Sequence, residues 1–211
     1  AAEVNRFVAE ARKGTAFGNQ ILAKYLKSQK WIEDATSDRD RSRFKDVAEL
    51  IRHYAGRYEF DWLMIAAQGY QESRLDQSKR SPVGAIGIMQ VMPATARDPN
   101  VGIPDIEVPE KNVHAGVKYL RFLRDRYYAD AALTPLDQTL FSFAAYNAGP
   151  GNVGKARRRA AQLGLDPDVW LDNVEIAAGQ AVSRQPVVYV RNIYKYYVAY
   201  KLIATQPTAA N

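Results

Sequence analysis

Residues 61–73 of the chain read DWLMIAAQGYQES, a run that is apolar on almost every side until it reaches Glu72. Asp61 can accept hydrogen bonds from free backbone N–H groups, which predicts a helix that begins at Trp62. A helix that is apolar nearly all round is expected at the centre of a core. The sequence therefore predicts a central buried helix that carries Glu72 towards its C-terminal end.

Glu72 is the first candidate for chemistry in this run. Burial penalises the charged form of its carboxyl group and the negative end of the helix dipole opposes that charge, so both effects raise its pKa. A carboxylic acid that stays protonated near neutral pH can protonate a glycosidic oxygen. On position alone, a structural glutamate paired with Arg74 is the more frequent arrangement. The nearest other carboxylate, Asp76, is expected to be a turn or cap residue rather than a catalytic one.

Helical spacing continues on both sides of the run. Residues 44–54 carry one apolar face, whereas residues 74–87 hold several turn formers and predict a loop with room for a small hairpin. Patterns typical of strands are sparse along the whole chain. The helices expected further along follow Pro93, begin at Pro109, cover residues 136–147, begin again near Asn152 and open for the last time at Pro186.

The first 40 residues differ from the rest in composition. Two short amphipathic helices are expected within residues 2–26, and the polar, charged run 34–43 predicts the boundary of the main domain. We expect residues 1–40 to form a helical extension or linker, residues 41–205 to form the main domain and residues 206–211 to form a tail.

Composition narrows the chemistry that the chain can perform. Of its 211 residues, 47% are apolar and 25% are charged, which is typical of a globular protein and enough for one sizeable core. The absence of cysteine excludes a thiolate nucleophile and, with only two histidines, disfavours a structural zinc site. No run approaches the roughly 20 apolar residues that span a bilayer. The formal net charge of +6 favours a polyanionic partner such as nucleic acid, anionic lipid or an acidic wall polymer.

Four motifs in a fixed order carry a resemblance to a known family. The first joins Gln71-Glu72-Ser73 to residues 81–96, which read SPVGAIGIMQVMPATA. The others lie at residues 109–120, 145–149 and 189–193, and the four together cover roughly residues 45–200. In this order they closely resemble family 1, the Slt-type lytic murein transglycosylases, and the combination is far more specific than any single motif.

The resemblance implies a fold and a reaction. The fold would be α+β, mainly α, in the form of a lysozyme-like domain. Glu72 would protonate the oxygen that links N-acetylmuramic acid to N-acetylglucosamine, and would then act as a base on the muramoyl C6 hydroxyl as that oxygen closes a 1,6-anhydro ring. Because the attacking oxygen belongs to the substrate, one carboxylate suffices and orientation supplies much of the rate. The implied partner is peptidoglycan, with no metal, no cofactor and no nucleic acid.

The resemblance also assigns six residues to substrate binding. Each has an ordinary structural interpretation as well, because helix-end serines bond local backbone, methionines and tyrosines fill cores, and asparagines turn the chain. The family's last motif often has Glu-Thr shortly before its tyrosine, where this chain has Gln185-Pro186. The six residues are Ser73, Met89, Gln90, Tyr146, Asn147 and Tyr189.

Within the family, the chain most closely resembles the membrane-bound F type. Residues 1–40 look like the segment that joins the N-terminal domain of that type to its catalytic module. The resemblance therefore implies a monomeric enzyme of the periplasm. It also implies a lipid anchor to the outer membrane, carried by an N-terminal part that this chain lacks.

Three other interpretations stay open or fail on particular residues. Residues 149–155 fit the spacing of a phosphate-binding loop, but Ala156 stands where a hydroxyl must hold Mg²⁺ and Pro150 removes a backbone donor. A hydrolytic lysozyme would use water and leave a reducing end. The basic run 157–159 leaves open a nucleic-acid-binding or wall-binding module without activity, although such a run on a helix is more often a solvated face.

Overall fold

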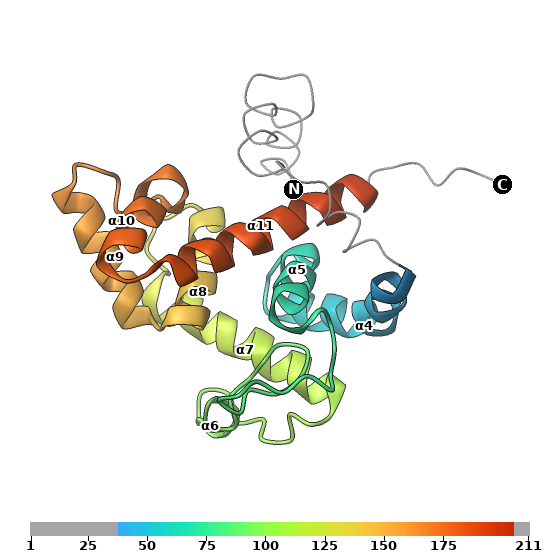
Figure 1. Cartoon of the computed structure of the whole chain (residues 1–211). Coiled ribbons are helices and arrows are strands. Elements are labelled where there is room, and N and C mark those ends of the chain that lie inside the picture. The colour runs from blue at the N-terminus through green and yellow to red at the C-terminus, as the bar shows by residue number, and fades with distance from the viewer. Residues whose placement is uncertain (1–37, 205–211) are drawn as a thin grey trace.

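Helices make up nearly all of the regular structure in residues 38–204, the part of the chain that the computed structural model describes. They are α4 (Asp38–Arg57), α5 (Trp62–Ser73), α6 (Pro93–Arg97), α7 (Pro109–Tyr127), α8 (Pro135–Ala148), α9 (Pro150–Gln162), α10 (Glu175–Ala181) and α11 (Arg184–Ala204), with a distorted turn, η1 (Trp170–Val174), before α10. Figure 1 shows α11 crossing from the group formed by α8, α9 and α10 to α5, beside α4. The helices expected in residues 2–26 and the tail 206–211 lie outside the described residues. None of the described helices has the length and unbroken apolar character that a bilayer crossing requires.

α5 is the central buried helix that its sequence predicts. Asp61 caps it, because Asp61 Oδ1 accepts a hydrogen bond from Leu63 N at 2.9 Å. The other carboxylate oxygen of Asp61 accepts a hydrogen bond from the Tyr197 hydroxyl at 3.0 Å, which ties the start of α5 to α11. Nine of the 12 residues of α5 are buried, so the helix that carries Glu72 is held on most sides.

Several helices begin at a proline, but the last helix begins two residues before its proline. α6 begins at Pro93 and α7 at Pro109, as expected. α11 begins at Arg184, ahead of Pro186, because the first backbone N–H groups of a helix have no partner within it and proline is tolerated throughout the first turn.

α4 begins at Asp38, inside the polar run 34–43 that was expected to mark a domain boundary, so that part of the run is helical.

The loop between α5 and α6 contains isolated β-bridges in place of strands. Ile86 pairs with both Arg80 and Val91 in antiparallel bridges, so the small hairpin expected in this loop is present in a minimal form. Gly87 has φ +76° and Gln90 has φ +46°, two left-handed positions that fold the chain back on itself. In the described part of the chain the fold is therefore mainly α, with its β character confined to this loop.

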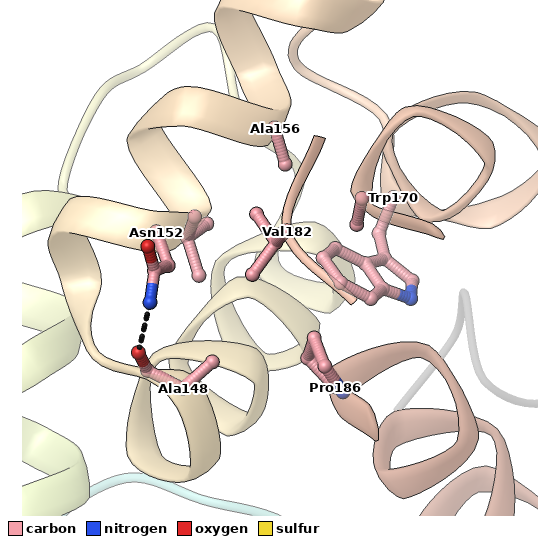
Figure 2. A pocket seen from close by; sticks show the side chains of 8 residues that line it. Ala148, Asn152, Ala156, Trp170, Val182 and Pro186 are labelled. Atoms are coloured by element: carbon pink, nitrogen blue, oxygen red, sulfur yellow. Dashed lines mark hydrogen bonds between the residues drawn. The ribbon is translucent and has the colours of Figure 1, made fainter. Parts of the chain in front are cut away.

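Apolar side chains fill the region between α9, η1 and the start of α11. Figure 2 shows a gap that Trp170 and Pro186 help to line, between α9, η1 and the start of α11. The Trp170 ring meets the Phe141 ring edge to face, with 5.7 Å between ring centroids. The polar side chain at the gap, Asn152, donates a hydrogen bond to the carbonyl of Ala148 at 3.0 Å. The gap has no room for a water molecule, so it is a packing feature rather than a binding site.

Two glycines let the loop between α5 and α6 approach the helices on either side of it. A Cβ atom at Gly116 of α7 would lie 2.5 Å from Met89 Cβ, closer than two carbon atoms approach without moving. A Cβ atom at Gly69 of α5 would lie 2.9 Å from Leu75 Cδ2 and 3.3 Å from Ile88 Cγ2. Met89 and Ile88 are fully buried. The loop is therefore wedged between α5 and α7.

Gly116→Ala tests this close packing. We expect the variant to lose about 2 kcal/mol of free energy of unfolding, because a methyl group forced into a filled core displaces its neighbours. Gly56→Ala is the matched control, since no atom lies within 4 Å of a Cβ at that position in α4, and it should gain about 0.5 kcal/mol. Urea denaturation of both variants measures the difference. Equal stability of Gly116→Ala and the parent chain would contradict the wedged arrangement.

Candidate active site

Glu72 lies next to the last residue of α5, Ser73. The helix ends there because Arg74 adopts a left-handed conformation with φ 57° and ψ 39°, from which its backbone N–H bonds to the carbonyls of Gly69 and Tyr70. The Glu72 side chain is half-buried at this end. The last carbonyl groups of the helix oppose a negative charge on its carboxyl group.

Tyr189 of α11 reaches this carboxyl group from the neighbouring helix. Its hydroxyl donates a hydrogen bond to Glu72 Oε1. The phenolic oxygen in turn accepts a hydrogen bond from Gln68 Nε2 at 3.3 Å. Tyr189 is buried, and this burial, followed by the adjacent Glu72 carboxylate, raises the pKa of its hydroxyl well above the usual value. The phenol therefore keeps the proton that it donates to Glu72.

The carboxyl group of Glu72 holds its proton unusually strongly. Burial raises its pKa from 4.5 to about 7, while the hydrogen bond from Tyr189 acts in the opposite direction. A large share of the molecules therefore carries a neutral carboxylic acid here at neutral pH. Neither cause is a basic neighbour, and Arg74 is exposed, so the alternative of a glutamate paired with Arg74 is wrong.

Asp76 is the turn residue that its sequence predicts. Its Oδ1 atom accepts hydrogen bonds from Ser78 N at 2.9 Å and from Ser78 Oγ at 2.6 Å. Its Oδ2 atom pairs with the guanidinium group of Arg43 at 2.7 Å. The hydrogen bonds from Ser78, with the Arg43 charge, hold the pKa of Asp76 below its usual value. Asp76 is thus an ionised carboxylate at neutral pH and cannot act as the proton donor.

Asn112 of α7 holds the loop in place from one side. This side chain is fully buried, and its Oδ1 atom accepts a hydrogen bond from Met89 N at 2.8 Å. Its Nδ2 atom donates to Ile86 O at 2.8 Å and to Ile106 O at 3.0 Å. Buried backbone groups that have no strand partner need side-chain partners instead. Asn112 is the partner of Met89 N and gives Ile86 O a second hydrogen bond, and so fixes the loop against α7.

Ser73 holds the loop from the other side. Its Oγ atom donates to Ile88 O at 2.9 Å and accepts from Asp76 N at 3.0 Å, and the side chain is buried. Ser73 therefore joins the end of α5 to the loop, because its hydroxyl bonds to backbone groups of the loop. Gln77 adds a weaker contact, with its Oε1 atom 3.3 Å from Ile88 N.

Tyr146 of α8 connects a third helix to the same loop. Its hydroxyl donates a hydrogen bond to Met89 O at 2.8 Å. Its ring lies against that of Tyr119, with 5.3 Å between the ring centroids. Burial raises the pKa of Tyr146 well above its usual value, and the charge of nearby Glu72 adds to this shift. The expectation that Tyr146 and Glu72 belong to one region of the molecule is consistent with this arrangement.

Met89 lies in the core in this structure. Its side chain is 0% exposed and packs on Gly116, as its ordinary structural interpretation predicts. Gln90 and Asn147 are half-buried and remain candidates for ligand contact. Gln90 Nε2 donates to Gly87 O at 2.9 Å. The Oδ1 atom of Asn147 is buried and has no hydrogen-bond partner among the described residues.

Two residues of the site were missed by sequence reasoning. Gln68 is a polar side chain that follows the apolar part of the helix, four residues before Glu72. This break in the apolar pattern is the signal that could have indicated it. Asn112 stands inside a motif whose resemblance gave it no role. No three His, Asp or Glu side chains in residues 38–204 gather as the ligands of a metal ion would.

Comparison with known proteins identifies the family to which the chain belongs. A family model described as the transglycosylase SLT domain matches residues 49–167. The membrane-bound lytic murein transglycosylase F of Desulfosudis oleivorans is 34% identical over 212 residues, which covers 92% of this chain and 46% of that protein. The chain spans less than half the length of the curated relatives that it matches first.

Two solved structures share the fold. The 70 kDa soluble lytic transglycosylase of Escherichia coli is 26% identical, with a TM-score of 0.54, over 75% of this chain and 24% of that one. An inactive glutamate-to-glutamine variant of the lytic transglycosylase Slt of Pseudomonas aeruginosa is 27% identical, with a TM-score of 0.54, over 75% of this chain and 25% of that one. The expected lysozyme-like, mainly helical fold is thereby confirmed.

Glu72→Gln tests the raised pKa through protein stability. The folded chain holds the Glu72 proton up to about pH 7, whereas an unfolded chain releases it near 4.5, so folding stability is full below 4.5 and falls as pH rises through 7. Glutamine cannot ionise and escapes this loss. Relative to the parent chain, the variant should gain roughly 3 kcal/mol between about pH 4 and pH 8, measured by urea denaturation. A stability difference that does not change with pH would refute the shift.

Asn112→Ala tests the anchoring of the loop. The change leaves the buried Met89 N–H without a partner and removes one of the hydrogen bonds that Ile86 O and Ile106 O each accept, so we expect a loss of about 2 kcal/mol of free energy of unfolding. Hydrogen exchange at the Met89 amide should accelerate more than exchange within α11. The control is Asn100→Ala, which removes an exposed amide that bonds to Asp98 and should change stability by less than about 0.5 kcal/mol. Unchanged exchange at Met89 would mean that the loop is held elsewhere.

Proposed function

Because the chain belongs to the transglycosylase SLT domain family, we propose that it cleaves the glycan strands of bacterial peptidoglycan as a lytic transglycosylase. In this proposal Glu72 is both the acid and the base. The observation that carries it is a half-buried carboxyl group whose pKa is raised to about 7 by burial and which receives a hydrogen bond from Tyr189. Such a group can give up a proton and take one back near neutral pH.

The proposed reaction conserves every proton. Glu72 gives its proton to the glycosidic oxygen as the bond from this oxygen to C1 of N-acetylmuramic acid breaks. The C6 hydroxyl of the same sugar then attacks C1, and its proton passes to the Glu72 carboxylate. The product carries a 1,6-anhydro ring, no water is consumed and Glu72 regains its starting state. An attacking group inside the substrate makes orientation the main demand on the protein.

A single carboxylate is consistent with this chemistry. A hydrolase that works with two carboxylates needs a second one beside the sugar. The nearest other carboxylate in sequence, Asp76, is committed to Ser78 and Arg43. Burial raises the pKa of Glu72, and no acidic neighbour among the described residues contributes to the rise. The inactive glutamate-to-glutamine variant of the Pseudomonas aeruginosa relative supports a glutamate as the essential group.

We assign substrate contact to fewer residues than the resemblance implies. Gln90 and Asn147 are half-buried and carry amide groups that suit the N-acetyl and hydroxyl groups of a sugar. Tyr146 and Tyr189 position the loop and Glu72 through their hydroxyl groups, and their rings border the same region. The side chains of Ser73 and Met89 are omitted from this list.

The basic run at residues 157–159 does not favour a nucleic-acid partner. Arg157 is half-buried, pairs with Asp168 and donates a hydrogen bond to Pro167 O at 2.9 Å. Its guanidinium group also lies 5.3 Å from the centroid of the Phe141 ring. This arginine is therefore part of the fold. The net charge of +6 suits a wall polymer whose stem peptides carry carboxylates.

We further propose that the chain acts in the periplasm as a monomer. The relatives named as membrane-bound lytic murein transglycosylase F support a site of action at a membrane surface. Attachment through a lipid on another part of a longer protein would place the enzyme at the outer membrane.

Glu72→Gln is the direct test of the catalytic assignment. With purified sacculi as substrate, the variant should release muropeptides about 10²–10⁴ times more slowly than the parent chain, because glutamine neither gives nor takes the proton. Asp76→Asn is the control and should keep most of the activity. Mass spectrometry of the products should find anhydromuramoyl ends one water lighter than reducing ends. Reducing ends would identify a hydrolase, and full activity of Glu72→Gln would move the acid elsewhere.

The pH dependence of turnover gives an independent test. The first step needs protonated Glu72, so kcat/KM should fall as pH rises above about 7, the pKa of this carboxyl group in the folded chain. An ordinary glutamate would already have lost activity above about pH 4.3. Initial rates of muropeptide release from about pH 5 to 9 measure the profile. A profile that is flat through pH 8 would contradict a protonated Glu72 as the acid.

A further inference from the structure

We propose that Gln68 is a positioning residue of this site, which directs the Tyr189 hydroxyl at one oxygen of Glu72 and so leaves the other oxygen to carry the catalytic proton. The inference rests on the proposed function, because it assumes that Glu72 transfers a proton. It adds a residue that no motif assigns and that does not touch the substrate.

The contact chain runs through three side chains on two helices. Gln68 and Glu72 lie four residues apart on α5, so they share one face of the helix. Tyr189 of α11 stands between them, with Gln68 Nε2 3.3 Å from its oxygen and its hydroxyl proton donated to Glu72 Oε1. Gln68 is 0% exposed, so no solvent competes for its side chain. The direction of each hydrogen bond is therefore set inside the protein.

The single proton of a phenol makes this direction matter. A hydroxyl group can donate once and can accept on its remaining lone pairs. Because the amide N–H of Gln68 occupies the accepting side of the Tyr189 oxygen, the hydroxyl proton is left for Glu72. Without that N–H, the hydroxyl could rotate away from the carboxyl group.

The same arrangement distinguishes the two oxygens of Glu72. In the structure, Oε1 is the oxygen that accepts from Tyr189. An oxygen that accepts from a fixed donor is a poor place for the acid proton, which is therefore carried by Oε2. Fixing this choice presents one defined proton to the glycosidic oxygen and one defined base to the C6 hydroxyl, as positioning in catalysis requires.

Stability alone does not explain a glutamine at this position. The Oε1 atom of Gln68 is buried and has no hydrogen-bond partner among the described residues, which destabilises the fold. The neighbouring positions from Leu63 to Ala67 are apolar and buried. A methionine of similar length would fill the same space without leaving a buried polar atom unpaired. A local rule broken without a structural gain is typical of a functional position.

Gln68→Met and Tyr189→Phe, alone and together, test the proposal in the full chain. Gln68→Met should keep or raise the melting temperature while lowering kcat about tenfold, the scale on which indirect hydrogen-bond partners act. Loss of the directed bond should also raise the pKa of Glu72, so the high-pH limb of the activity profile moves to higher pH. In the Tyr189→Phe background, Gln68→Met should have no further effect on kcat or on the profile.

Ser142→Ala is the matched control, because it too removes a fully buried polar group, here a hydroxyl on α8 that bonds to backbone. It should change the melting temperature without moving the pH profile. Gln68→Leu serves in place of Gln68→Met if the latter does not fold, with the same expected result. An active parent chain combined with an unmoved profile for both variants, or with full additivity to Tyr189→Phe, would overturn the role of Gln68. An inactive parent chain, or a fully active Glu72→Gln, would instead overturn the proposed function.

Discussion

A carboxyl group without a counter-charge constrains the whole arrangement. Glu72 lies at the carbonyl end of a helix that is buried on most sides, and burial raises its pKa to about 7. An ion pair would have removed this property, because a basic neighbour favours the charged form. The structure instead places a neutral donor, Tyr189, against one oxygen of Glu72. Tyr189 reaches Glu72 because α11 packs along α5.

The loop after α5 shows how irregular backbone is held beside such a group. It has only isolated bridges, so its buried carbonyl and amide groups depend on side chains from the helices around it. Asn112 of α7, Ser73 of α5 and Tyr146 of α8 each bond to it. Because three helices hold one loop, the position of Gln90 is set by the whole domain rather than by local sequence.

Conformational strain gathers at the same place. Among the five non-glycine residues with positive φ in the described part of the chain, Arg74, Leu75 and Gln90 belong to the end of α5 or to the loop that follows. Left-handed conformations of such residues are uncommon and persist where the surrounding packing enforces them. The stranded Oε1 atom of Gln68 adds a second local cost in the same region. These local costs lower the stability of the fold in the region of the candidate active site.

The sequence by itself determined most of the helices, the central position of α5 and Glu72 as the residue of interest, because the run 61–73 has an apolar period, a cap and one carboxylate at its end. The ordered motifs determined the family. Tertiary structure alone decided what surrounds the carboxyl group: it removed Arg74 as a partner and supplied Tyr189 with Gln68 behind it. It also set Ser73 and Met89 in contacts that support the loop. Periodicity reports which face of a helix is buried, but the partner of a side chain is fixed by residues more than one hundred positions away, here in α11, whose approach depends on packing throughout the core.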